Sequence, residues 1–245
     1  EISELGNLSN KEAVRYELIG YLISSNISEE KNKIKFSTEN EYNINRFSRL
    51  LSNMEINNYD ITVQGNLFVI RVNKNMIKDL NIDEDFNLEQ VKWLIRGAYL
   101  GSGSINNPER KYHLEIGIAK KNNAEKIVEY LKNYDIKSNI IEKKSEYAIY
   151  LKDGEEISKL LALLGANKSV IRFEEIRVQR EMNNKINRIV NCETANLNKT
   201  INASIEQIEA IKKLKKNNEF EKLDDSLKKI VVSKKNKSYK AVDGV

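Results

Sequence analysis

Apolar residues recur at helical spacing over residues 91–108 of this 245-residue chain. They occupy positions 91, 94, 95, 98 and 99, which predicts a buried helix. Small residues at positions 101–104, followed by two asparagines and the only proline of the sequence, predict the end of that helix.

A looser copy of this stretch lies at residues 14–27, near the N-terminus. Gly20 and Ser24 of the copy align with Gly97 and Gly101 of the later stretch. Small residues one helical turn apart allow two helix backbones to approach closely. We therefore predict that these four positions pack two helices against each other.

The similarity between the two stretches continues along the chain at an offset of about 80 residues, and a constant offset indicates an internal duplication. Each copy is expected to contain a helix, a strand, a helix, two strands and a closing helix (αβαββα). The first copy is assigned to residues 1–83 and the second to residues 84–168. The corresponding pairs of segments are 33–36 with 114–118, 45–51 with 125–131, and 67–72 with 147–152.

Capping residues predict where several helices begin. Asn10 is expected to cap the first helix, residues 38–40 the second, and Asn122 with Asn123 the corresponding helix of the second copy. Closing helices are expected at residues 75–80 and 154–164.

The predicted strands alternate between apolar and polar side chains, as strands with one solvated face do. This pattern predicts an α+β fold in which two antiparallel sheets pack under helices. Charge on the open sheet faces is most simply explained by solvation, and Glu115 would repel a DNA backbone, so we expect no main binding surface there. The residues expected on these faces are Lys33, Lys35, Thr62, Gln64, His113, Glu115 and Lys143.

Beyond residue 168 the chain is rich in alternating charges at helical spacing. A helical linker is predicted over residues 169–198, and a second amphipathic helix is predicted over residues 199–216. The amide- and hydroxyl-rich segment 191–200 is expected to interrupt the helical structure between them. Residues 231–245 are basic and are predicted to form a disordered tail.

Composition narrows the classes of protein. The net charge of +5 and the pI near 9.0 are compatible with a polyanionic partner, although genome bias is an alternative source of the many lysines. No stretch approaches the ~20 apolar residues of a membrane span, and no signal peptide is recognisable. Cys192 is the only cysteine and His113 the only histidine, which excludes an internal disulfide and argues against a zinc site. We expect a cytoplasmic protein without metal, cofactor or membrane association.

The duplicated helices, each ending in small residues and followed by antiparallel strands, resemble the LAGLIDADG homing-endonuclease fold. In that family the paired helices lie at a pseudo-twofold axis, and each delivers a carboxylate at its C-terminal end to the metal ions that cleave DNA. The corresponding positions here are Ser25 and Ser102, and no acidic residue lies between Lys92 and Pro108. Because a neutral hydroxyl is a poor ligand for Mg²⁺, the resemblance implies a degenerate site without nuclease activity.

Longer motifs resemble the WhiA family of bacterial regulators. They read RGAYLGSGSINNP (96–108), YLKDGEEI (150–157), LLGA (163–166) and VNCETANLNKT (190–200). The resemblance implies a LAGLIDADG-like domain followed by a helix-turn-helix domain that binds double-stranded DNA, with roles in sporulation, cell division and chromosome segregation at the nucleoid. Residues 199–230 are predicted to begin the helix-turn-helix domain and to leave it incomplete, because no further amphipathic helix after a glycine turn is recognisable.

Basic side chains are densest toward the C-terminal end, where they can bind phosphate by Coulomb attraction and counterion release. The alternative explanation is a solvated helix face. Two other functions are also considered: a module that binds another transcription or cell-division protein, and an active homing endonuclease, which the two serines disfavour. The candidate DNA-binding residues are Lys199, Lys212, Lys213, Lys215, Lys216, Lys228 and Lys229.

Overall fold

The computed structural model describes all residues except 5–7, 81, 83–85, 145 and 244–245, and no side chain after residue 237 is described. The described chain forms two units, residues 1–178 and residues 179–245. No helix among the described residues is long and apolar enough to cross a membrane.

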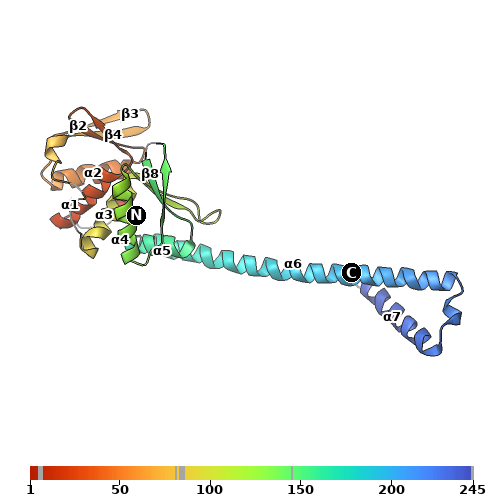
Figure 1. Ribbon diagram of the computed structural model, residues 1–245. Helices are drawn as coiled ribbons and strands as arrows, with labels where there is room; N and C mark the ends of the chain where they lie inside the picture. The colour runs from red at the N-terminus through yellow and green to blue at the C-terminus, as the bar shows by residue number, and fades with distance from the viewer. Residues whose placement is uncertain (5–7, 81, 83–85, 145, 244–245) are drawn as a thin grey trace. The chain divides into compact units, whose positions relative to one another are not determined.

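The first unit consists of two halves with the same order of elements (Figure 1). A 3-10 turn, η1 (Ile2–Glu4), precedes the first half, and another, η2 (Lys74–Met76), follows its last strand. The elements of the first half are α1 (Lys11–Ile23), β1 (Ile27–Glu30), β2 (Lys33–Thr38), α2 (Glu41–Asn53), β3 (Tyr59–Gln64) and β4 (Leu67–Asn73). Those of the second half are α3 (Leu88–Ser102), β5 (Gly103–Ile105), β6 (Leu114–Ile118), α4 (Lys121–Asn133), β7 (Asn139–Lys143), β8 (Glu146–Leu151) and α5 (Gly154–Leu163).

Each half contains one antiparallel sheet, and the two strand orders, β1-β2-β4-β3 and β5-β6-β8-β7, are equivalent. The predicted α+β fold with two antiparallel sheets is therefore confirmed. The predicted series of elements lacks one strand in each half, since β1 and β5 follow the paired helices directly. Both strands are short and largely exposed, and β5 lies in a Gly-Ser run, which is more typical of a turn than of a strand.

Local capping explains where most helices begin. The side chain of Asn10 accepts hydrogen bonds from the N–H groups of Glu12 and Ala13, and Asn40 caps α2 in the same way. Asn87 and Gln90 form a capping box at α3. The predicted Asn122–Asn123 cap of α4 is wrong, because that helix begins at Lys121 and its N-cap, Lys120, makes no side-chain cap. The closing helix predicted at 75–80 is reduced to the turn η2.

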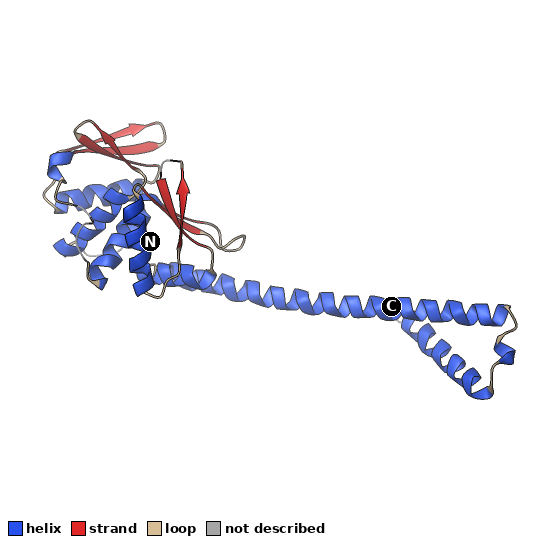
Figure 2. Ribbon diagram, viewed as in Figure 1, coloured by secondary structure: helices blue, strands red, loops and turns tan. Residues whose placement is uncertain are grey.

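One apolar core joins α1 and α3 to the inner faces of both sheets. Figure 2 shows that the helices of this unit lie next to one another, and that the strands lie at its periphery. Fully buried side chains come from every layer, including Leu18 and Leu94 from the helix pair, Phe36 from the first sheet and Ile116 from the second. The helix pair is therefore the centre of the unit, and both sheets are positioned against it.

The second unit contains most of α6 (Asn167–Lys216), the turn η3 (Phe220–Lys222) and α7 (Asp225–Asp243), which turns back after the end of α6 (Figure 1). The helix interruption predicted at 191–200 is wrong, because α6 is continuous there. The polar side chains of that segment bond within the helix: Thr200 Oγ1 donates to the carbonyl oxygen of Asn196 at 3.0 Å.

The disordered tail predicted at 231–245 is also wrong, since residues 231–243 belong to α7. Asp224 caps this helix: its Oδ1 accepts a hydrogen bond of 2.9 Å from Leu227 N–H. Ser204, Ile208 and Ile211 of α6 are buried within the second unit.

Candidate functional site

The two paired helices touch backbone to backbone at Gly20 and Gly97. A Cβ atom placed on Gly20 would lie 2.6 Å from the backbone nitrogen of Ala98, and one placed on Gly97 would lie 2.8 Å from the carbonyl carbon of Glu17. Both distances are shorter than any real carbon contact, so only glycine fits at either position. One turn later, Gly101 faces the buried side chain of Ser24.

The C-terminal ends of both helices meet strand β6 at Gly117. The N–H of Ser25 donates to the carbonyl oxygen of Gly117 at 3.0 Å, and the Ser102 hydroxyl donates to the same oxygen. A Cβ on Gly117 would collide with the hydroxyl of Ser25. The two serine positions therefore lie close together, as the duplication predicts, and their polar atoms serve to hold the helix ends against the second sheet.

Two carboxylates come near these helix ends: Glu146 Oε2 lies 3.4 Å from the position of a Cβ on Gly117, and Glu115 is paired with other side chains. Glu115 forms an ion pair with Lys143 and lies 3.4 Å from His113 Nε2. Burial opposes its ionisation, but the Lys143 hydrogen bond and the His113 contact together lower the pKa of Glu115. No three His, Cys, Asp or Glu side chains in the described part of the chain come together as a metal site. The two positions that would supply carboxylates hold the neutral hydroxyls of Ser25 and Ser102, so this donor set does not fit the divalent metal that homing endonucleases use.

Replacing Ser102 by alanine tests whether its hydroxyl has a functional role. We expect DNA affinity to stay within about twofold of wild type and stability to fall by only about 1 kcal/mol, because one intramolecular hydrogen bond is lost. Gel retardation and thermal unfolding measure the two quantities. A tenfold loss of DNA affinity would show that Ser102 does more than fasten a helix end.

The basic side chains on the open face of the first sheet are paired with carboxylates of the same sheet. Lys33 pairs with Asp60 at 2.7 Å, and Glu30 accepts from both Lys35, at 3.2 Å, and Arg71, at 2.9 Å. Thr62 joins this network through Arg71. Each of these cations already has a carboxylate partner, which reduces the attraction of this face for phosphate, although exposed ion pairs of this kind are individually weak.

Positive charge is concentrated in the second unit. Residues 179–245 contain 15 Lys and Arg against 9 Asp and Glu, a net charge of +6, whereas residues 1–178 contain 26 against 27, a net charge of −1. Of the seven candidate lysines, Lys228 lies 3.9 Å from Glu221 and Lys215 lies over the ring of Phe220 at 5.2 Å. The other five are exposed, and their side chains make no hydrogen bond or ion pair among the described residues: Lys199, Lys212, Lys213, Lys216 and Lys229.

Sequence reasoning missed a buried ion pair beside the helix crossing. Arg46 of α2 donates two hydrogen bonds, of 2.7 and 2.8 Å, to the carboxylate of Glu17 in α1, and both side chains are 3% exposed. The available signal was a glutamate directly before the apolar run of residues 18–23. Two amides were missed as well: Asn26 donates to Gly101 O at 2.7 Å and Asn43 donates to Leu100 O at 2.8 Å, so both occupy carbonyl groups at the end of α3.

Comparison with known protein families gives two matches, one mainly in the first unit and one in the second. The WhiA LAGLIDADG-like domain matches residues 91–183, and the WhiA C-terminal HTH domain matches residues 186–241. The second match begins before the predicted start of the helix-turn-helix at 199 and includes residues 231–241, where the tail was predicted.

Similar solved structures agree on the fold. Full-length DUF199/WhiA from Thermatoga maritima has a TM-score of 0.68 at 22% identity, over 97% of this chain and 84% of that chain. The N-terminal LAGLIDADG domain of DUF199/WhiA has a TM-score of 0.60 at 22% identity, over 67% of this chain and 86% of that chain.

Two curated relatives are each called "Probable cell division protein WhiA". The one from Clostridium tetani is 43% identical over 64% of this chain, and this match spans about half (48%) of that relative. The one from Bacillus mycoides is 35% identical over 93% of this chain and 81% of its own length. The chain belongs to the WhiA family.

Proposed function

We propose that the protein is a DNA-binding transcription regulator that contacts double-stranded DNA through its second unit. The observation that carries this proposal is the charge distribution: a net charge of +6 lies in the unit that matches the helix-turn-helix domain, and the LAGLIDADG-like unit is close to neutral. Exposed lysines without acidic partners bind phosphate readily, because contact releases the counterions condensed on DNA.

The cellular role is proposed by analogy with the relatives. Their name supports a role in cell division, and the family resemblance extends the proposal to sporulation and chromosome segregation. Such a regulator would act in the cytoplasm, on the nucleoid.

We further propose that the LAGLIDADG-like unit does not cleave DNA. Phosphodiester cleavage by that scaffold requires carboxylates that hold metal ions and activate water. Ser25 and Ser102 are neutral, and the Ser102 hydroxyl is bonded to Gly117. Glu17 is committed to Arg46 and cannot replace a ligand without breaking that pair.

A retardation assay with supercoiled and linear DNA tests both parts of the proposal. With Mg²⁺ or Mn²⁺ present we expect retardation that weakens steeply with salt, and no nicking. Neutralising Lys212, Lys213 and Lys216 to glutamine is expected to weaken binding by about tenfold or more and to reduce the salt slope by about 2–3, since each phosphate contact contributes about 0.9.

The matched control neutralises three exposed lysines of the first unit: Lys31, Lys111 and Lys132. The control and the test variant therefore have the same net charge. This control is expected to bind DNA almost as wild type does. Equal losses in both triple variants would assign binding to overall charge and not to the second unit. Metal-dependent nicking that a chelator abolishes would restore the endonuclease interpretation.

A protein-interaction module is the second candidate function. Apolar side chains that are about half exposed recur along α6, namely Met182, Ile186, Ile189 and Val190, and such side chains at helical spacing suit a helix-binding protein partner. The partner proposed for this module is another transcription or cell-division protein. Absence of both retardation and nicking in the assay would favour this candidate.

A further inference from the structure

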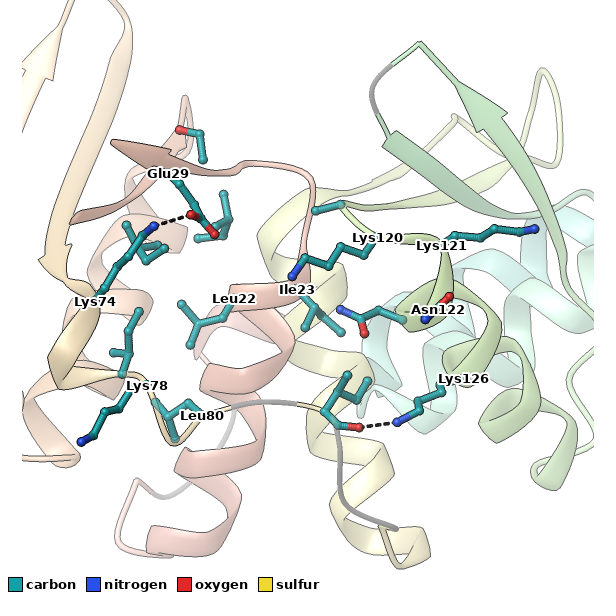
Figure 3. A pocket seen from close by; sticks show the side chains of 17 residues that line it. Leu22, Ile23, Glu29, Lys74, Lys78, Leu80, Lys120, Lys121, Asn122 and Lys126 are labelled. Atoms are coloured by element: carbon teal, nitrogen blue, oxygen red, sulfur yellow. Dashed lines mark hydrogen bonds and ion pairs between the residues drawn. The ribbon is translucent and has the colours of Figure 1, made fainter. Parts of the chain in front are cut away.

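A hollow of about 830 Å³ opens in the first unit between the end of α1, strand β1 and the start of α4 (Figure 3). Its volume falls within the range of about 300–1,000 Å³ typical of small-molecule sites. The described apolar residues that line it are all aliphatic, and five of them are only partly buried, so their side chains border the open space. These five are Leu22, Ile27, Ile34, Leu80 and Ala119.

Lysines surround this aliphatic floor. Among the described residues that line the hollow there are five lysines and one acidic residue, Glu29, which is bound to Lys74. Lys126 donates to the carbonyl oxygen of Ile82 at 2.8 Å. The side chain of Lys120 makes no hydrogen bond or ion pair among the described residues, and Figure 3 shows it extending over Ile23 into the hollow.

The start of α4 adds to the positive potential on the same side. The helix has 13 residues, and its N-cap, Lys120, provides no side-chain oxygen for the free N–H groups of the first turn. Unsatisfied N–H groups and the helix dipole favour an anion at this end. Asn122, in the first turn, also lines the hollow.

The fold itself does not impose this basic rim. The internal duplication places an equivalent hollow, of about 640 Å³, between the end of α3, strand β5 and the start of α2. There, Asn40 caps the helix, and the charged lining residues are two glutamates and one arginine: Glu1, Glu109 and Arg172. The lysines are therefore a property of one side of the duplication only.

We propose that the hollow between α1, β1 and α4 binds a small amphiphilic anion, consisting of an aliphatic chain with a phosphate or carboxylate head group. The Leu and Ile side chains take up the chain, and Lys120 with the start of α4 takes up the head group. The described part of the lining contains no aromatic ring, which disfavours a nucleobase, since bases usually stack on aromatic side chains. This site is independent of the DNA-binding proposal.

Methyl NMR on the full chain, with labelled isoleucine δ1 carbons, tests the site directly. The probes are n-octyl phosphate and octanoate, below their micellar concentrations, with inorganic phosphate and 1-octanol as the separate halves of the ligand. We expect octyl phosphate or octanoate to shift the Ile27 and Ile34 signals and to bind at least about tenfold more tightly than either half alone, because both contacts are made together. The comparison of the two heads distinguishes phosphate from carboxylate.

Three variants separate this site from non-specific binding of an apolar chain. Lys120→Gln is expected to weaken binding of the better probe by about tenfold through loss of a charge-assisted contact. Glu29→Gln is expected to strengthen it, because Lys74 is released from its ion pair. Lys132→Gln, on the exposed side of α4, is the matched control and is expected to change nothing.

The proposal is overturned by unchanged affinity in Lys120→Gln, by shifts confined to isoleucines of α6, or by inorganic phosphate binding as tightly as octyl phosphate. Absence of binding by both amphiphiles at millimolar concentration overturns it as well. Each of these outcomes leaves the DNA retardation result unaffected, so failure of this site and failure of the proposed function are distinguishable.

Discussion

Gly97→Leu is expected to lower the melting temperature of the first unit by about 6–12 °C. A side chain at this position must displace the backbone of α1, since even a Cβ would lie 2.8 Å from the carbonyl carbon of Glu17 and 3.0 Å from the Cα of Gly20. Backbone cannot rotate away as a side chain can, so we place the cost at the upper end of overpacking, about 3 kcal/mol. For a domain of this size each kcal/mol corresponds to roughly 2–4 °C.

Trp93, the only tryptophan, lies on α3 and makes its fluorescence a local probe of this unfolding. Ala162→Leu is the matched control, because it adds the same leucine side chain at an exposed position of α5. The control should melt within about 2 °C of wild type, as surface substitutions usually do. If Gly97→Leu and the control melted alike, the helices would not be in close backbone contact.

The helix pair is readable from the sequence because close backbone approach restricts residue type at single positions. Gly20 and Gly97 recur at the same place in both copies, and the structure brings them to one crossing. The sheets are readable for a related reason: alternating apolar residues in β6 and its neighbours all reach the same core. Features that depend on a residue's own steric demand or polarity therefore appear in the sequence.

Other features depend on partners that are distant in sequence. Strand β1 forms because residues 27–30 pair with β2. Its own residues do not alternate between apolar and polar side chains, so the sequence does not predict it. The polar segment 191–200 resembles a cap, but within α6 its side chains bond to the preceding turn. In both cases local chemistry allows two structures, and the pattern alone does not choose between them.

The candidate site divides in the same way. The duplication is sufficient to align Ser25 with Ser102, but their common partner, Gly117, comes from a different element. The structure brings Lys143 to Glu115, and these residues are 28 positions apart in sequence. Glu17 and Arg46 are 29 positions apart, and neither pairing has a periodic signature.

Arg46→Leu is expected to destabilise the first unit by about 3–5 kcal/mol, since it leaves the Glu17 carboxylate buried without its partner. Both side chains are 3% exposed, so water does not replace the lost hydrogen bonds. In the native unit burial opposes the charged form, yet the hydrogen bonds to Glu17 raise the pKa of Arg46, so the guanidinium stays charged. Urea unfolding followed by Trp93 fluorescence measures the loss.

A double-mutant cycle with Glu17→Met separates the pair from the two single sites. The double variant should be much more stable than the sum of the single losses predicts, because replacing a whole buried pair by apolar residues is often nearly neutral. Arg96 limits this recovery. Burial lowers the pKa of this arginine, and the nearby charge of Glu17 opposes that effect. Removing Glu17 therefore takes a counter-charge from both Arg46 and Arg96. Glu17→Met should therefore be the more damaging single change. Additive losses in the cycle would mean that the two side chains contribute separately, and the bidentate pair would then have no energetic role.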